Sequence, residues 1–224
     1  KNKKMESRMK LLSSFGPNPR MVRMFCIEKG IDIETVEHDL LGGENRAAAY
    51  TAKNPGGQMP ALELDDGSVI GETVAVCEYL EEKNPSNPLI GSSAEERAET
   101  RMWVRRVELN ITENMYNGFR YAEGIDIFRD RMLCFPESAD SLKAKAKGAR
   151  EWLDDLMAGR NFVGGDKMTL ADLILFCCLD FMNGVGQPLE PELSNLSSWM
   201  ERMNGRASAA ASLHPGAAET GMQG

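Results

Sequence analysis

A proline at the start of a predicted strand is the feature that most restricts how this chain folds. Pro60 comes just before the apolar alternation of residues 61–64 and directly after Met59, at the end of the turn Asn54-Pro55-Gly56-Gly57-Gln58-Met59. Proline has no N–H to donate to a sheet, so this position requires a turn, a bulge or a sheet edge, and a cis Met59–Pro60 bond is one way to build it. We therefore expect the backbone of Met59 to be exposed.

A hairpin and the start of a helix follow this turn. Residues 65–68, with the sequence Asp-Asp-Gly-Ser, predict a tight turn into a second short strand at residues 69–70. Glu72 and Thr73 then precede apolar residues at helical spacing. A strand edge and a helix N-terminus are therefore predicted to meet.

The first third of the chain is predicted to fold in the order βαβαββα. Residues 10–14 and 31–37 have the length and the apolar pattern of strands. Between them, a helix is expected to begin with Asn18 as its N-cap and Pro19 in its first position. Residues 47–50 are predicted to form a short helix.

Strand signals stop after a segment that is rich in turn-forming residues. We interpret residues 85–93 as a linker and residues 9–84 as the domain before it. Residues 94–207 show helical periodicity, and the serines just before them are expected to cap the first helix. Residues 208–224 are rich in Ala, Ser and Gly and are predicted to form a flexible tail. The predicted fold class is therefore α/β plus all-α, with a C-terminal helical bundle domain.

Composition excludes several classes of partner. The chain has 224 residues, of which 42% are hydrophobic and 27% charged, as is ordinary for globular proteins. Its formal net charge of −8 argues against a nucleic-acid partner, because phosphate binding needs a clustered basic surface. No apolar run approaches the roughly 20 residues of a membrane span. We expect no nucleic acid, no membrane partner and a cytoplasmic location.

The cysteines predict neither a metal site nor a disulfide framework. Five cysteines and two histidines form no CxxC pair and show no metal-ligand spacing. Each cysteine lies in or beside an apolar helical stretch, so we interpret them as buried structural thiols. Redox chemistry would then require an external thiol.

Taken together, these patterns resemble the cytosolic glutathione transferases of bacterial type. The order Gln-Met-Pro-Ala-Leu, a hairpin and then Glu-Thr opening a helix is similar to their thioredoxin-like, glutathione-binding domain. Residues 161–172 resemble a loop and capping box of their helical domain, and the matching pieces span roughly residues 9–205. The resemblance implies a thioredoxin-like domain at 9–84, a helical domain at 94–207 that forms the second-substrate pocket, and a homodimer.

The resemblance also implies a set of glutathione-binding residues. The Met59 backbone would pair with the cysteinyl part of glutathione like an added strand. Thr73 and the helix N–H groups would hold the γ-glutamyl carboxylate, and Glu72 would lie near its ammonium. Asn45 would bind the glycyl carboxylate, with Arg46 as the alternative. The full predicted set is Phe15, Asn45, Gln58, Met59, Pro60, Glu72 and Thr73.

The group that activates the thiol departs from the usual pattern. Serine-type relatives place a serine four residues before an arginine, and here Gly16 stands four residues before Arg20. Two catalytic candidates remain open. Asn18 matches a nu-like subgroup with a Thr-Pro-Asn pattern, whereas Ser14 has the spacing of the tyrosine in tyrosine-type relatives. We favour Asn18, because its amide can donate to a thiolate sulfur.

The second substrate is expected to lie between the domains. The predicted pocket residues are Met115, Tyr116, Phe119 and Arg120. Arg120 would favour an anionic co-substrate, anchor glutathione itself, or form a solvated ion pair. The predicted function is attack of a glutathione thiolate on a small electrophile, or glutathione-dependent reduction of a disulfide or peroxide. The alternative is a non-catalytic ligand-binding or protein-interaction scaffold with the same fold.

Overall fold

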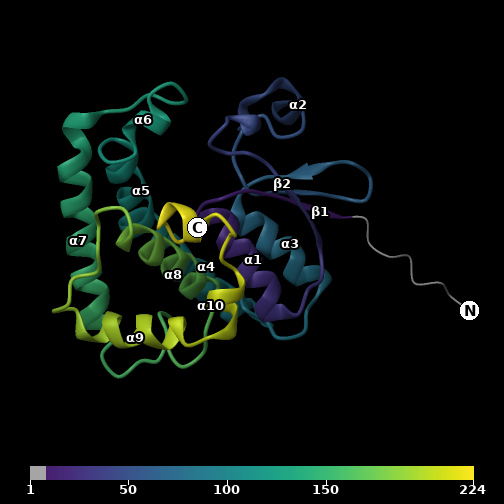
Figure 1. Cartoon of the computed structure of the whole chain (residues 1–224). Helices are drawn as coiled ribbons and strands as arrows, with labels where there is room; N and C mark the ends of the chain where they lie inside the picture. Colours follow the sequence, from purple (N-terminus) through teal and green to yellow (C-terminus); the bar gives the residue numbers. More distant parts are fainter. Residues whose placement is uncertain (1–8) are drawn as a thin grey trace, which may run out of the picture.

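The computed structural model describes residues 9–224 and contains a small mixed sheet beside a larger helical domain (Figure 1). The sheet has four strands in the order β2-β1-β3-β4, with β1 parallel to β2 and the other neighbours antiparallel. The strands are β1 (Lys10–Ser13), β2 (Glu34–Glu37), β3 (Ala61–Glu63) and β4 (Val69–Ile70). With helices α1, α2 and α3, these strands give the predicted order βαβαββα.

Helices cover both faces of the sheet. The N-terminal helices are α1 (Pro17–Lys29), α2 (Ala48–Thr51) and α3 (Thr73–Lys83). Side chains alternate along a strand, so neighbouring leucines of β1 enter different clusters. Leu11 packs with Leu62 and the α1 and α3 side chains, whereas Leu12 packs with Ala61 and Tyr50 of α2.

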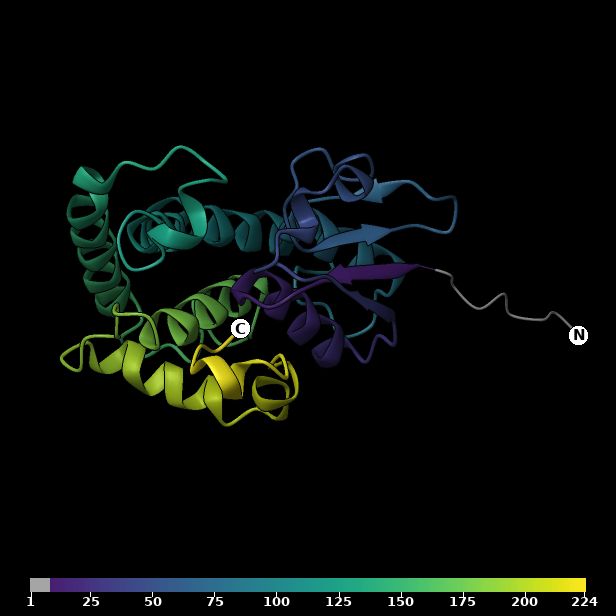
Figure 2. The same cartoon turned by 45° about the horizontal axis from the view of Figure 1, so that its top comes forward.

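The helical domain is built around a long first helix and a central apolar helix. Residues 94–120 form α4 (Ala94–Val107), a π-helical segment (Glu108–Thr112) and α5 (Glu113–Arg120) without a break. The helix α8 (Leu170–Asn183) is apolar on nearly every side and therefore lies buried between α1 and the other helices (Figure 2). The other elements before residue 205 are 3-10 turns at Glu44–Arg46 and Pro136–Ser138, and α6 (Ile125–Phe128), α7 (Ala139–Leu156) and α9 (Ser194–Asn204).

Local sequence signals set several of these boundaries. The Met59–Pro60 bond is cis. Ser93 caps α4 by accepting a hydrogen bond from the Glu96 N–H at 3.1 Å. At the start of α8, the Thr169 N–H donates to Asp172, as the capping box predicts.

A buried ion pair fixes the segment between the domains. Lys29 Nζ of α1 and Glu81 Oε2 of α3 lie 3.2 Å apart, and both side chains are buried. Glu81 also accepts the N–H groups of Leu89, Ile90 and Gly91. The segment between α3 and α4 is therefore held against the N-terminal domain.

The prediction of a flexible tail is wrong. Residues 207–224 include α10 (Ala207–Ala211) and α11 (Ala217–Thr220), and the segment lies against α1 (Figure 1). The reason is long-range: buried Arg20 donates to Ser212 Oγ and to the Ala209 carbonyl, and Arg23 donates to the Ser212 carbonyl. The amino-acid composition of the segment does not indicate these contacts, because the arginines that make them lie in α1.

The predicted cap of the first helix is also wrong. The helix α1 begins at Pro17 with Gly16 as its N-cap residue, so Asn18 already lies inside the first turn. Gly16 has φ 132°, a conformation that favours glycine.

Within residues 9–224, no helix is both long and apolar enough to cross a bilayer.

Candidate active site

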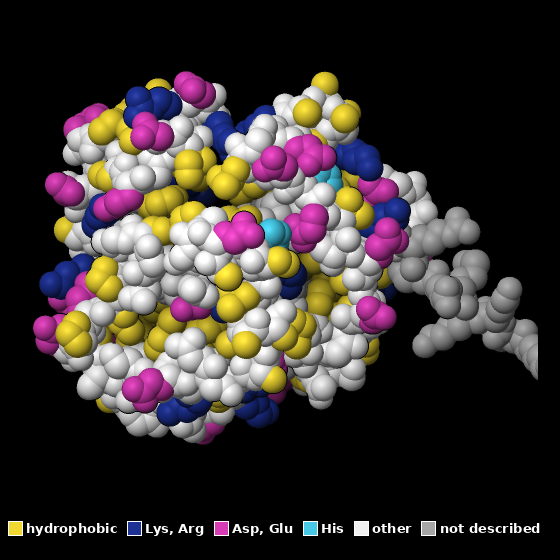
Figure 3. Space-filling model, in the orientation of Figure 1, with side chains coloured by type: hydrophobic (Ala, Val, Ile, Leu, Met, Phe, Trp, Pro, Cys, Tyr) yellow, Lys and Arg dark blue, Asp and Glu magenta, His cyan; other side chains and the backbone are white. Residues whose placement is uncertain are grey.

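A cleft lies between the two domains and receives side chains from both. It encloses about 840 Å³, its open mouth included. Hydrophobic side chains wall the hollow between the domains, and Lys or Arg side chains border it (Figure 3). The predicted residues that line it are Ser14, Phe15, Asn18, Asn45, Gln58, Met59, Tyr116, Phe119 and Arg120. Most of the predicted site is thus brought to one place.

The turn before β3 presents a free strand edge to the cleft. Tyr50 Oη and Asn54 Nδ2 donate to the Gln58 carbonyl at 2.7 and 2.9 Å, which fixes the turn. Among the described residues, the Met59 backbone has no hydrogen-bond partner of its own. Pro60 lies behind it, buried, and does not line the cleft. An extended ligand can therefore pair with Met59 as an added strand would.

Asn18 is the one source of free N–H donors in the first turn of α1. Its neighbours Pro17 and Pro19 have no N–H, and the Arg20 N–H already bonds to the Gly16 carbonyl. The Asn18 side-chain amide makes no hydrogen bond to any residue in the described part of the chain. Because the start of a helix carries a positive partial charge, these donors favour an anion.

Ser14 has less to offer a ligand. Its side chain is buried, and its hydroxyl donates to the neighbouring Phe15 carbonyl at 3.2 Å. Arg23 donates to the Ser14 carbonyl and to Ser13 Oγ. Ser14 therefore borders the cleft, but its proton is directed to the backbone.

A smaller acidic pocket adjoins the cleft. Glu72, Thr73, Glu108 and Glu113 line it, and Asn18 and Tyr116 line both spaces. Burial raises the pKa of Glu108, and the charges of Glu113 and Glu72 act in the same direction, whereas Arg105 lowers it. Glu72 has φ 66°, a strained conformation that residues adopt at ligand sites. The first N–H groups of α3, beginning at Thr73, open beside these carboxylates.

Asn45 and Arg46, the two candidates for the glycyl carboxylate, present different groups to the cleft. Asn45 Nδ2 donates to the Gly57 carbonyl at 2.6 Å, and its Oδ1 is buried without a partner. That free atom is an acceptor, so it suits an N–H group and not a carboxylate. Arg46 lies beside Gly57 and lines the cleft with no carboxylate partner among residues 9–224. The alternative, Arg46, is thus the group that fits a ligand carboxylate.

The helical side of the cleft comes mainly from one face of α5. Tyr116, Phe119 and Arg120 follow the i, i+3, i+4 spacing of a helix face, and all three line the cleft. Met115 does not: its side chain is fully buried in the core, and its carbonyl accepts from Gln187. The prediction of Met115 as a pocket residue is wrong, because it lies on the neighbouring face of the helix.

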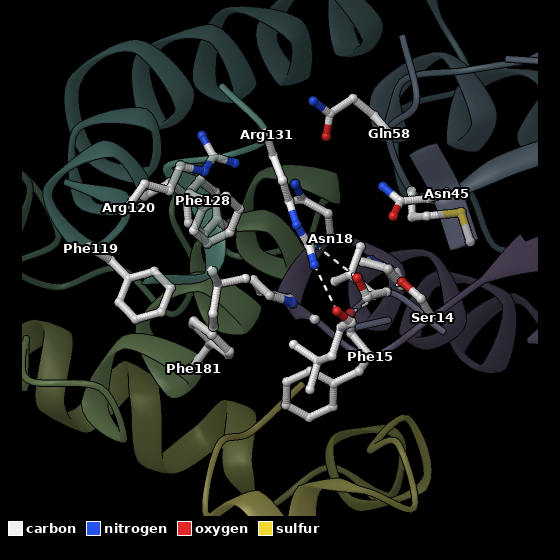
Figure 4. Close-up of a pocket in the computed structure, with 18 of the residues that line it drawn as sticks. Ser14, Phe15, Asn18, Asn45, Gln58, Phe119, Arg120, Phe128, Arg131 and Phe181 are labelled. Atoms are coloured by element: carbon white, nitrogen blue, oxygen red, sulfur yellow. Dashed lines mark hydrogen bonds between the residues drawn. The ribbon is translucent and has the colours of Figure 1, made fainter. Parts of the chain in front are cut away.

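Several lining residues carried no signal in the sequence. Arg131 follows α6 and donates to the carbonyls of Leu40 and Leu41 at 2.8 and 2.7 Å, so it joins the two domains across the cleft. Figure 4 shows Gln58, Asn45 and Ser14 on one side, Phe119, Phe128 and Phe181 on the other, and Arg131 between them. The lining residues that were not predicted as site residues are Gly16, Pro17, Pro19, Leu40, Leu41, Ile127, Phe128, Arg131, Phe181 and Met222.

Comparison with known proteins identifies this arrangement. The glutathione S-transferase N-terminal domain matches residues 15–83, and the C-terminal domain matches residues 121–202. The solved structure of a glutathione S-transferase domain-containing protein from Marinobacter aquaeolei is 30% identical with a TM-score of 0.83, covering 89% of this chain and 98% of that one. The chain belongs to the glutathione S-transferase family. Glutathione S-transferase 2 of Saccharomyces cerevisiae is 28% identical over 200 residues, which cover 86% of this chain and 84% of the relative. The structure of Gtt2 from the same yeast has a TM-score of 0.84 at 27% identity and covers 91% of this chain and 100% of that one.

Family membership confirms the broad predictions. The thioredoxin-like fold with a helical second domain, the transferase class and glutathione as co-substrate are all shared with these glutathione S-transferases. In the part of the chain that the structure describes, no group of three or more His, Cys, Asp or Glu side chains is placed to hold a metal ion.

Proposed function

We propose that this glutathione transferase binds glutathione across Met59, with the γ-glutamyl end in the acidic pocket and the glycyl end at Arg46. The observation that carries this proposal is the opposite charge of the lining in two neighbouring pockets that share Asn18 and Tyr116. Glu72, Glu108 and Glu113 line the pocket at one end. Arginines line the cleft at the other end, where no Asp or Glu of the described residues takes part.

Glutathione has the complementary polarity. Its γ-glutamyl end carries an ammonium, which would stabilise the charged form of Glu108, whose pKa is raised by burial and, to a lesser degree, by the charges of Glu113 and Glu72. The carboxylate of the same end fits the N–H groups and hydroxyl of Thr73 at the start of α3. The glycyl carboxylate fits the guanidinium of Arg46. The peptide between them is the right kind of group to pair with the free backbone of Met59.

In this arrangement the thiol lies near the start of α1, and we propose that Asn18 stabilises its thiolate. A thiol at its ordinary pKa is mostly protonated at neutral pH, so donors that favour the anion increase the reactive form. Asn18 supplies a side-chain amide and a backbone N–H at a helix N-terminus. The thiolate sulfur then bonds to the electrophilic carbon of the second substrate. The leaving group departs with the electrons of the broken bond, and the thiol proton has gone to solvent.

The test is the pKa of the bound thiol. The ultraviolet absorbance of the thiolate is followed against pH in wild type, Asn18→Ala and Ser14→Ala, while calorimetry measures glutathione affinity. A hydrogen bond to a charged group contributes about 1.5–3 kcal/mol, so we expect Asn18→Ala to raise the bound thiol pKa by about one to two units. Glutathione affinity should change by less than about threefold, because the charged ends keep their partners.

Ser14→Ala is the matched control, since it also removes a polar group from the same wall of the cleft. We expect it to leave the thiol pKa within about 0.3 units of wild type, because the Ser14 proton is directed to the Phe15 carbonyl. The reverse result, a shift in Ser14→Ala and none in Asn18→Ala, would assign the role to Ser14. Absence of glutathione binding in folded wild type would reject the site and favour the scaffold alternative.

Two further features of the proposal come from the family. We propose a homodimer in the cytoplasm, which light scattering and cell fractionation test directly. A mechanism through the protein's own thiols has no support, because Cys26 and Cys77 are buried and burial raises the pKa of both.

A further inference from the structure

Positive charge collects in the cleft of an otherwise acidic chain. The chain has a net charge of −8, yet Arg46, Arg120 and Arg131 all line this cleft. Across residues 9–224, no carboxylate lies within ion-pair distance of any of the three. By contrast, the two arginines that are buried within residues 9–224 are both paired: Arg20 with Asp180 and Arg150 with Glu190, each at 2.5 Å. Arg120 and Arg131 are partly buried and Arg46 is exposed, so the cleft holds cations that an anionic ligand can reach.

Arg120 is the most pronounced case. Its guanidinium carbon lies 5.6 Å from the ring centres of both Tyr116 and Phe128. One nitrogen donates to Asn117 Oδ1 at 3.1 Å, which leaves the other N–H groups free. The two rings hold the guanidinium in place, so an incoming anion would meet a pre-ordered partner.

The other two arginines are less available for a second substrate. Both terminal nitrogens of Arg131 donate hydrogen bonds to the Leu40 and Leu41 carbonyls, so Arg131 contributes positive charge but few free donors. Arg46 lies on the N-terminal side, beside Gly57, where the glycyl end of glutathione is proposed to bind. Arg120 is therefore left for the second substrate.

The surroundings of Arg120 are aromatic. Phe119 makes edge-to-face contacts with Phe128 and Phe181 at centroid distances of 6.2 and 5.6 Å, and Phe181 contacts Phe15 at 6.4 Å. Figure 4 shows Phe119, Phe128 and Phe181 on the same side of the cavity as Arg120. Such a wall binds a flat or bulky apolar body, with the cation at one point of its edge.

We propose that the second substrate is an aromatic or similarly apolar electrophile that carries a negative charge, and that Arg120 binds this charge. The inference rests on the proposed transferase function and names its substrate class. In the reaction, the glutathione sulfur bonds to the electrophilic carbon and the leaving group departs as an anion with the bond electrons. The negatively charged group of the substrate takes no part in these bond changes; its contact with Arg120 only orients the substrate in the cleft.

A matched pair of substrates tests this. Chlorodinitrobenzene is neutral, whereas chlorodinitrobenzoate has the same reacting centre and an added carboxylate; in both, a carbon–sulfur bond replaces the carbon–chlorine bond and chloride leaves. Each kcat/KM is divided by the uncatalysed rate constant of the same substrate with glutathione. The ratio of the two normalised values, anionic over neutral, measures recognition of the charge alone.

We expect this ratio to exceed one in wild type and to fall at least about tenfold in Arg120→Gln, mainly through KM of the benzoate. Arg120→Lys should keep part of the preference, because the charge remains but the fork of donors is lost. Arg160→Gln is the control, since the Arg160 guanidinium also lies over an aromatic ring, that of Trp103 at 5.7 Å, but outside the cleft. It should leave the ratio unchanged.

Three results would overturn the proposal. One is a wild-type ratio at or below one, and another is an equal loss for both substrates in Arg120→Gln. The third is a rise in KM for glutathione in Arg120→Gln with an unchanged ratio, which would make Arg120 an anchor for glutathione. Failure of wild type to bind glutathione or to convert either substrate is a different outcome, because it rejects the proposed function itself.

Discussion

An ion pair between α1 and the C-terminal segment allows the ordering of that segment to be tested quantitatively. Arg206 donates to both carboxylate oxygens of Glu28 at 2.7 Å, and Ser208 donates to the same carboxylate. The Glu28 side chain is 12% exposed and that of Arg206 33%. Glu28→Gln removes the charge and one acceptor oxygen but keeps the shape of the side chain.

The expected loss follows from this geometry. Hydrogen bonds to charged groups contribute about 1.5–3 kcal/mol when they are buried, whereas exposed ion pairs contribute about 0.2–1 kcal/mol. Because Arg206 is partly exposed to solvent, we expect Glu28→Gln to lower the free energy of unfolding by about 1–2 kcal/mol at neutral pH. Urea unfolding at constant slope measures this difference. A double-mutant cycle with Arg206→Gln separates the pair from the other contacts of each residue.

The dependence on pH gives the experiment a second, independent readout. Hydrogen bonding from Arg206 lowers the pKa of Glu28 below its ordinary 4.5, although burial acts in the opposite direction. A group with a lowered folded pKa stabilises the fold above its unfolded pKa, and this contribution is lost as pH falls through the folded pKa. The difference between wild type and Glu28→Gln should therefore be full at pH 7 and shrink below about pH 4.5. A difference that is under about 0.5 kcal/mol, or that does not change with pH, would refute the reasoning.

Two other predictions concern the cap of α8 and the thiols. Thr169→Ala removes the hydrogen bond from the Thr169 hydroxyl to Asp172 at 3.3 Å but keeps the bond from the Thr169 backbone N–H at 2.8 Å. We expect urea unfolding to show a free energy of unfolding that is lower by about 0.5–1 kcal/mol, with turnover unchanged. Lost turnover at full stability would contradict this prediction. Burial raises the pKa of Cys26 to about 12, whereas Cys134 is only partly buried. A thiol reagent should therefore modify Cys134 in the native protein and Cys26 only after unfolding. Mass spectrometry of the modified peptides would show which cysteine has reacted.

Features that depend on a few neighbouring residues were predictable from the sequence. Pro60, Glu72 and Thr73 lie where turn and helix chemistry placed them, and the Met59–Pro60 bond is cis. The capping box at Thr169 is present for the same reason, because its partners are only three residues apart. Such contacts join residues that are close in the chain, so a linear pattern can indicate them. The pattern at Asn18 and Pro19 still misplaced the start of α1, which begins at Pro17.

Features that depend on distant residues were not predictable. The C-terminal segment has weak periodicity and is ordered by Arg20, whose contact with Ser212 spans 192 positions. Met115 and Tyr116 are adjacent and both suit a pocket by type, yet only the packing of α5 decides that Met115 faces the core. Nothing near Arg131 in the chain indicates that it crosses to Leu40 and Leu41.

The sequence by itself determined the βαβαββα order, the turn that ends at Met59 and Pro60, the start of α3 and the helical second domain, because short-range sterics and hydrogen bonding govern each of these. The tertiary structure decided which end of the site is acidic, which arginines are left without a counter-charge and which aromatic rings surround Arg120. Those properties come from separate segments that meet only when the core is packed, and charge and shape complementarity depend on that meeting.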